Sequence, residues 1–340
     1  MKKETIIGRF PHLRRQSPQE IAVPSHIETI RAEGFSWTDI QNPTRAEIDK
    51  LGEQYGFNAL NLDDAVSKIQ LAKIDNYEDH SFIILHFPPM VIKRGMPKFS
   101  QLSVFVGKDF LITIHSGDLK PLVEMFAQCR DSEQRRNELL SKSPGFLLHK
   151  IIDALVDDLL HTLRRIVANL DEIEDDVFDE TKSTPRKIAL LRREITILRR
   201  IVTPLRRIVL ETSKNTQRFS NPDDDLVLHF DDVIDHIDKV VETLEEAKET
   251  MEIYKDSDFV LSTEKANKIL GTLTILFTLS IPATVVGAIY GMNVNLPGGI
   301  ETGSWMFLGE YTTFVIMMMF SIVPAAIMFV WFYRRGWLTD

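Results

Sequence analysis

The sequence predicts an α+β membrane protein, with an N-terminal α/β domain, long helices and two C-terminal transmembrane helices. Short alternating or β-branched apolar runs come first, helical apolar stripes follow, and two uncharged runs lie near the C-terminus. About 20 apolar residues are enough to cross a bilayer core. We expect a poorly structured lead-in at 1–25, the α/β domain at 26–141, a stalk of long helices at 142–266, transmembrane helices at 267–293 and 312–333, the loop between them at 294–311, and a basic tail at 334–340.

The α/β domain is predicted from strand and turn patterns. Residues 35–40, 68–85 and 102–114 alternate or run apolar with β-branched residues, which is typical of strands. The segments 76–79 and 107–109 have the composition of hairpin turns. Helices are expected from Arg45, around 58–66 and over 119–141, where they would cover the sheet.

The stalk is predicted from helical periodicity. Apolar residues in the first long helix form one continuous stripe, at 151, 155, 159, 163, 166, 170, 173 and 177. A second helix begins at Pro185, a favoured first position, and contains Pro204, which is expected to bend it. Neither glycine nor proline occurs between Asp223 and Gly271, so a third helix is predicted to run from near Asp223 into the first transmembrane segment.

Charges beside the two apolar runs predict the orientation of the protein. Lys265 and Lys268 precede the first run, and Arg334 and Arg335 follow the second, whereas 291–311 contains neither Lys nor Arg. Basic residues favour the cytoplasmic side. We therefore expect a multi-pass protein of the cell membrane whose N- and C-termini, together with the α/β domain, are cytoplasmic.

The composition of the chain bears on its partners, its compartment and its targeting. A net charge of −9 argues against nucleic acid as a partner. The single cysteine, Cys129, excludes an intrachain disulfide and fits a reducing compartment. The first residues are basic but lack an apolar core, so a cleavable signal is not expected.

A motif at the end of the first apolar run identifies a family. That run closes with Tyr290-Gly291-Met292-Asn293, and both runs lie at the extreme C-terminus. In motif and topology the chain resembles the CorA family of divalent-cation channels. The strings WTDIQNPT, IDALVDDLL, TPLRRIV and FDDVIDHID follow the family pattern in order, so the resemblance covers nearly all of the chain. It implies a funnel of stalk helices, a homopentamer, and a selectivity filter at Gly291, Met292 and Asn293.

The chemistry of this motif suits such a filter. Gly291 permits close backbone approach or unusual dihedral angles at a helix end. Asn293 supplies a donor and an acceptor without fixed charge, so a ring of such amides would not trap a divalent ion. The alternative is that Asn293 merely caps the helix. Glu301 and Glu310 in the following loop could attract cations, although NLPGGIE replaces the acidic loop usual in the family.

One face of the first transmembrane helix is predicted to line the pore. Asn267 occupies the place of the family's inner polar ring, and the face then repeats every three to four residues. It comprises Asn267, Leu270, Leu273, Thr274, Phe277, Ile281, Thr284 and Ala288. Leu273 and Ile281 are expected to form apolar constrictions, and the polar positions to bind the water around a hydrated ion. One lining helix cannot enclose a channel, so closed cyclic symmetry is expected.

The stalk carries opposite charge runs that have two interpretations. Residues 182–218 are strongly basic and 223–258 strongly acidic. Neighbouring helices could neutralise each other through surface ion pairs, each worth about 0–1 kcal/mol. Alternatively, acidic residues around a central axis could concentrate or coordinate cations.

The resemblance places a regulatory metal residue at Asp232, with Asp235 and His236 beside it. In the family, an acidic residue from a neighbouring α/β domain completes this site. The corresponding loop, 88–99, has no carboxylate and offers Lys93, Arg94 and Lys98, which puts a Mg²⁺-release gate in doubt. His236 could ligate a transition metal, or could be an ordinary polar surface residue.

Three functions follow from these patterns. The first is a passive divalent-cation channel for Mg²⁺, with Co²⁺ and Ni²⁺ as further cargo. An intact Gly291-Met292-Asn293 motif and a predicted pore face poor in carboxylates favour Mg²⁺ as the main ion. The second is a Zn²⁺ transporter of the same superfamily. The third is a membrane-tethered enzyme or sensor. The sequence contains neither a phosphate loop nor a nucleophile–base pair that would support this function.

Overall fold

The computed structural model describes residues 26–32, 34–67, 70–88, 99–179, 182, 184–221, 224–292, 294–299, 303–307 and 309–337. The chain forms two compact units. The first comprises Met1–Ile173 and Arg186–Met251, and the second Glu174–Pro185 and Glu252–Asp340. The predicted lead-in, residues 1–25, lies outside the described residues.

A six-stranded mixed sheet forms the base of the first unit. Its order is β1-β2-β6-β5-β4-β3, with β2 and β6 parallel and the other neighbours antiparallel. The strands are β1 (His26–Arg31), β2 (Ser36–Gln41), β3 (Lys73–Asn76), β4 (His80–Phe87), β5 (Ser100–Gly107) and β6 (Phe110–His115). The predicted turns at 76–79 and 107–109 join β3 to β4 and β5 to β6. Strand β1, which the sequence patterns did not single out, extends the sheet beside β2.

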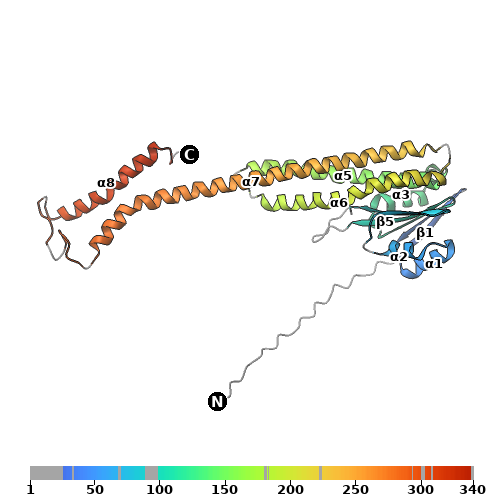
Figure 1. The fold of residues 1–340 in the computed structure, drawn as a ribbon, viewed down its shortest axis with the longest axis horizontal. Helices are drawn as coiled ribbons and strands as arrows, with labels where there is room; N and C mark the ends of the chain where they lie inside the picture. Colours follow the sequence, from blue (N-terminus) through green and yellow to red (C-terminus); the bar gives the residue numbers. More distant parts are fainter. Residues whose placement is uncertain are drawn as a thin grey trace, which may run out of the picture. The chain divides into compact units, whose positions relative to one another are not determined.

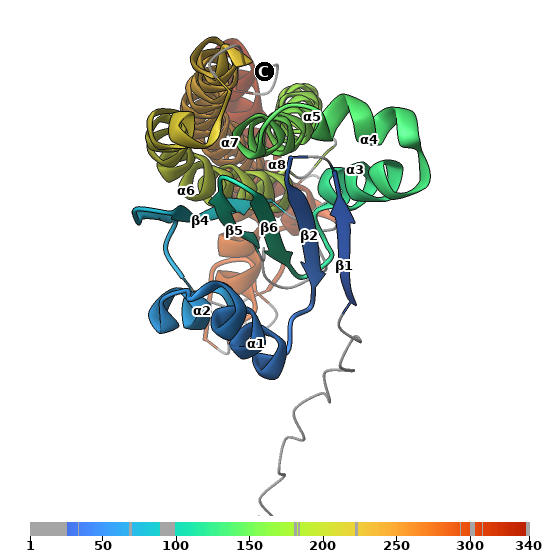
Figure 2. The same ribbon diagram turned by 90° about the vertical axis from the view of Figure 1, so that its right-hand side faces the viewer.

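Helices cover both faces of this sheet (Figure 2). Helices α1 (Arg45–Tyr55) and α2 (Ala59–Val66) bury Ile48 and Leu62 against Phe82, Phe105 and Ile112. The alternate residues of β4 and β5 are also buried, which is why these strands read as nearly continuous apolar runs.

The opposite face carries α3 (Lys120–Asp131) and α4 (Glu133–Leu140) near its edge (Figure 2). Phe126 of α3 packs edge-on against Trp37 of β2, with ring centroids 4.8 Å apart. The prediction of one helix over 119–141 was wrong. Ser132 ends α3, and its hydroxyl accepts from the Arg135 backbone N–H at 3.4 Å, so it also caps the start of α4.

Three long helices follow, and the second begins at Pro185, as predicted (Figure 1). They are α5 (Pro144–Phe178), α6 (Pro185–Thr216) and α7 (Leu226–Tyr290), with a short 3₁₀ turn, η1 (Gln217–Phe219), before α7. The predicted stripe of α5 is buried at every position, namely Ile151, Leu155, Leu159, Leu163, Ile166, Leu170, Ile173 and Val177.

The buried residues of α6 and α7 are regularly spaced. The buried positions of α6 include 188, 191, 195, 198, 202, 205, 209, 212 and 216, and those of α7 include 226, 230, 233, 237, 240, 244, 247 and 251. These steps alternate between three and four residues, which is the heptad spacing of left-handed coiled coils. The stalk part of the first unit is therefore held by coiled-coil packing.

Ion pairs connect the oppositely charged helices. Arg199 and Arg206 of α6 pair with Glu245 and Asp238 of α7. Arg165 of α5 lies 2.7 Å from Glu194 of α6. Part of the opposite charge on α6 and α7 is thus neutralised between neighbouring helices, as the first interpretation of these runs required.

Helix α7 continues without interruption to Tyr290, as predicted. Its 65 residues correspond to a length of about 98 Å at 1.5 Å per residue. The last helix is α8 (Thr312–Arg334). The α/β domain, the long helices and the two candidate transmembrane helices of the predicted fold class are all present.

Candidate functional site

The C-terminal part of α7 and all of α8 have the composition of membrane-spanning helices. Their most apolar windows reach a mean hydropathy of 2.0 and 2.4, and only 6% and 0% of those windows is buried within the chain. A core helix of a water-soluble protein of this composition would be covered by other elements. The exposed apolar surface is instead what a bilayer or further copies of the chain would cover.

The hydroxyl groups of the α7 span bond to their own helix. Thr274 Oγ1 donates to the Leu270 carbonyl oxygen at 2.7 Å, and Thr284 Oγ1 donates to that of Ser280 at 2.9 Å. Thr272, Thr278 and Ser280 donate to carbonyl oxygens in the same way. The donor of each hydroxyl is therefore used, and its oxygen lone pairs remain available as acceptors.

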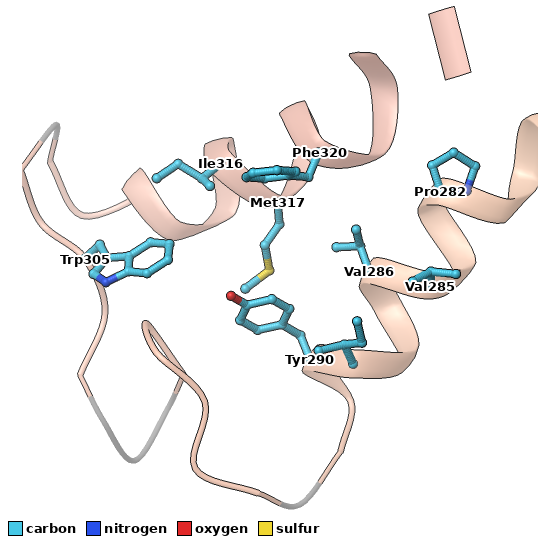
Figure 3. Close-up of a pocket in the computed structure, with 9 residues that line it drawn as sticks. Pro282, Val285, Val286, Tyr290, Trp305, Ile316, Met317 and Phe320 are labelled. Atoms are coloured by element: carbon cyan, nitrogen blue, oxygen red, sulfur yellow. The ribbon is translucent and has the colours of Figure 1, made fainter. Parts of the chain in front are cut away.

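Two apolar grooves lie between α7 and α8. One, of about 450 Å³, is drawn in Figure 3, where Val286 and Tyr290 of α7 face Met317 and Phe320 of α8. The other, of about 470 Å³, includes Leu279 and Ala283 of α7. These grooves define the face of α7 that is turned toward α8.

The predicted pore positions lie on the other side of α7. At about 100° per residue, Leu270, Phe277 and Thr284 are about 160°, 180° and 200° around the helix from Val286. Phe277 is 70% exposed and Ile281 53% exposed, and the remaining members of the predicted face are exposed as well. The chain thus leaves this face of α7 open, while α8 flanks the opposite face.

Polar positions recur among apolar ones along the open face. From the stalk end these are Asn267, Leu270, Leu273, Thr274, Phe277, Ile281, Thr284 and Ala288. Between Ile269 and Tyr290 the helix carries no charged residue. Any ion that moves along this face meets hydroxyl oxygens and apolar side chains, but no carboxylate.

The backbone at the end of α7 explains why the predicted filter has glycine at position 291. The Gly291 N–H donates to the Gly287 carbonyl oxygen at 2.9 Å, and the Met292 N–H to that of Ile289 at 3.2 Å. A Cβ atom at Gly291 would lie 2.9 Å from the Gly287 oxygen, which is too close for a larger residue without a shift. Met292 is 57% exposed. Asn293 lies outside the described residues.

Two aromatic residues line the groove beside the filter motif, and sequence reasoning did not assign them a role. The Tyr290 hydroxyl donates to the Pro297 carbonyl oxygen at 3.3 Å. Trp305 packs over Gly298, which has a φ of 79°, and both aromatics line the groove of Figure 3. Aromatic residues at the end of an apolar run were the available signal, since they are enriched at membrane interfaces.

The predicted regulatory residues lie on the stalk part of α7. Asp232 and Asp235 are exposed, and His236 Nδ1 is 4.0 Å from Asp157 of α5. Within the described residues, no group of three or more His, Cys, Asp or Glu side chains converges on a point that could hold a metal ion. Lys93, Arg94 and Lys98 of the partner loop lie outside the described residues.

Comparisons with known proteins agree on one family. Residues 32–334 match the family model described as "CorA-like Mg2+ transporter protein". The Bacillus subtilis protein YfjQ, named as a candidate metal ion transporter, is 26% identical over 312 residues, covering 88% of this chain and 89% of YfjQ. The "Cobalt/magnesium transport protein CorA" of Thermotoga maritima is 25% identical, covering 89% of this chain and 83% of that protein. The solved CorA magnesium transporter of Methanocaldococcus jannaschii superposes with a TM-score of 0.70 at 21% identity, covering 91% of this chain and 94% of that one.

Proposed function

The chain belongs to the CorA-like Mg2+ transporter family, and on that premise we propose that it is a passive channel for Mg²⁺, with Co²⁺ and Ni²⁺ as further cargo. The family consists of membrane-embedded divalent metal ion transporters, so the enzyme hypothesis is set aside. In this proposal five copies surround a pore lined by α7, and Gly291, Met292 and Asn293 form its outer filter. The first unit lies in the cytoplasm.

The open face of α7 carries this proposal. It is exposed, uncharged between Ile269 and Tyr290, and opposite the face that α8 flanks. Such a face would be left in water or lipid in a single copy. Around a symmetry axis it would face its own copies and enclose a path for ions.

The chemistry of this face suits an ion that keeps its water. Mg²⁺ gives up its water reluctantly, and a bound water turns its hydrogen atoms outward. The wall must therefore present acceptors. Thr274 and Thr284 do so, because their protons are already donated to backbone carbonyls and only lone pairs remain. Asn267 and Asn293 would add amide oxygens at the two ends.

Apolar residues on the same face supply a means of closure. Leu273 is 44% and Ile281 53% exposed within one copy. Rings of such side chains exclude ions when the water column between them breaks, without any fixed charge. Opening then requires the rings to widen or become wet.

Flux measurements test the proposal directly. The purified chain in proteoliposomes should pass Mg²⁺ down its gradient, and should also pass Co²⁺ and Ni²⁺. Empty liposomes and an Asn293→Ala protein serve as controls. Absence of Mg²⁺ flux from correctly assembled protein would contradict the proposal.

A Zn²⁺ transporter is the second candidate, and one observation favours it. The loop 88–99 lacks the carboxylate that would complete the family's Mg²⁺-sensing site. In the same liposomes, Zn²⁺ flux that exceeds Mg²⁺ flux at equal concentration would favour this candidate over the first.

A further inference from the structure

The C-terminal end of α8 folds into a defined turn. The Trp337 N–H donates to the Phe332 carbonyl oxygen at 3.2 Å, and the Gly336 N–H to that of Tyr333 at 3.1 Å. Gly336 has a φ of 79°, in the left-handed region that favours glycine. These are the two bonds of a Schellman motif. The motif's apolar contact is present as well, since the Trp337 and Phe332 rings stack with centroids 5.4 Å apart.

This turn brings a guanidinium and two indoles together. The Arg335 guanidinium lies over the Trp331 ring, 5.5 Å from its centroid. The Trp337 ring is 5.8 Å from that of Trp331. A guanidinium within about 6 Å of an indole face is held by a cation–π interaction, so its orientation is restricted.

The groups of this cluster have more donors than acceptors. The carbonyl oxygens of Trp331, Phe332 and Tyr333 each already accept a hydrogen bond from a backbone N–H group, so they are satisfied without a bond from Arg335. In the part of the chain that the structure describes, neither the Arg335 guanidinium nor the Trp331 and Trp337 indole N–H groups donate a hydrogen bond. A guanidinium alone has five N–H donors.

The depth of the cluster indicates where an acceptor would come from. Helix α8 has 23 residues, a length of about 35 Å, against about 30 Å for a hydrocarbon core. A helix that spans the bilayer therefore places its last turn among the lipid headgroups. There, the phosphodiester is an abundant acceptor, and its geometry matches a guanidinium.

We propose that Arg335, Trp331 and Trp337 form a binding site for the phosphodiester headgroup of an anionic phospholipid. The guanidinium binds the phosphate oxygens, and the indoles hold it in place and donate to the phosphate or the adjoining ester. Arg334 is next in the chain but about 100° around the helix, so it adds charge without belonging to the site. This inference rests on α8 spanning the membrane and is independent of the transported ion.

Native mass spectrometry of the full-length protein in detergent tests the site. The protein is titrated with dioleoyl phosphatidylglycerol, and separately with dioleoyl phosphatidylcholine. We expect phosphatidylglycerol to bind about tenfold more tightly. Arg335→Gln should lower that affinity about tenfold, to the level of phosphatidylcholine, and Trp331→Leu should also weaken it.

Arg334→Gln is the matched control, because it removes the same charge at nearly the same depth. It should change the affinity less than about threefold. Arg200→Gln, at an exposed position of α6, should have no effect on lipid affinity. Equal losses for Arg334→Gln and Arg335→Gln would show a diffuse surface charge and overturn the site, as would unchanged binding by Arg335→Gln. Displacement of the lipid by millimolar inorganic phosphate would assign the cluster to free phosphate instead, and would also overturn the proposal.

Discussion

His149 is a buried histidine at the contact between α5 and α7. Its Nε2 lies 3.1 Å from the His229 carbonyl oxygen, and its Nδ1 has no hydrogen-bond partner. Burial lowers the pKa of His149 to about 4 from an ordinary value of 6.5, because apolar surroundings disfavour the charged ring. The Asp153 carboxylate and the hydrogen bond to the His229 carbonyl oppose this lowering of the pKa, while the charges of Lys150 and the His229 ring add to it.

The lowered pKa predicts a pH-dependent stability. Between pH 6.5 and about 4 the unfolded chain binds a proton at this position and the folded chain does not. The stabilisation is therefore complete above pH 6.5 and is lost as the pH falls to about 4, by an amount on the order of 3 kcal/mol. His149→Gln should flatten the fall in Tm over this range, measured on the whole chain in detergent. His161→Gln, an exposed position on the same helix, should not; an unchanged slope for His149→Gln would refute the assignment.

Asn293 carries the most specific prediction for transport. An amide ring at the end of α7 would be the neutral oxygen source of the filter, so Asn293→Ala should abolish selective Mg²⁺ uptake into proteoliposomes. Size-exclusion profiles should remain those of the parent protein. Normal, selective transport by the variant would remove Asn293 from the filter and leave it as a helix cap.

The exposed apolar positions of α7 differ in the faces they occupy. Leu273 and Ile281 lie on the open face, and polar replacements there should raise basal flux because a side-chain amide restores wetting. Leu273→Asn and Ile281→Asn are therefore expected to leak divalent ions. Leu276→Asn makes the same change at a 60% exposed position about 100° from Phe277, which is at the centre of the open face, and should leave basal flux nearly unaltered. Reduced or unchanged flux in the first two variants would place the constriction elsewhere.

The heptad of α7 is expected to dominate the stability of the stalk. Leu244 is fully buried at a heptad position, and Leu244→Ala should destabilise the first unit by about 2–5 kcal/mol. Glu249→Ala, at an exposed position of the same helix, should change stability by less than about 0.5 kcal/mol. Thermal unfolding of the whole chain in detergent measures both. Similar losses in the two variants would contradict the coiled-coil interpretation.

Any regulation through Asp232 is expected at the contact between copies, where the resemblance to the family places a sensing site. Here Asp232 is exposed on α7, and its expected partner loop carries Lys93, Arg94 and Lys98 in place of a carboxylate. A cation cannot bridge a carboxylate to an ammonium, although an ion pair could hold the same interface. We therefore predict that internal Mg²⁺ closes this channel less steeply than a typical relative, and that Asp232→Ala changes the response little. Steep inhibition that disappears in Asp232→Ala would contradict this.

The sequence by itself determined the elements whose burial repeats along the chain. The stripe of α5 follows from a period of about 3.6 residues, and the two apolar runs follow from the absence of charge. The start of α6 at Pro185 and the hairpin turns follow from local residue composition. The grouping of the predicted pore positions on one side of α7 follows from helical periodicity alone, because it is a property of one helix. Ser132, a residue that favours N-caps, was the local signal for the break between α3 and α4.

Tertiary structure decided the rest, since it depends on residues that are distant in the chain. The pairing of β2 with β6 joins Thr38 to Ile112, and it creates the buried bond between Thr113 Oγ1 and Asp39 Oδ1 at 2.6 Å. The same holds for the burial of His149 against His229, and for the face of α7 that α8 flanks. A periodic pattern predicts that one face of a helix or strand will be buried, but it does not identify the element that covers it. That element is selected by long-range packing, which depends on both segments together.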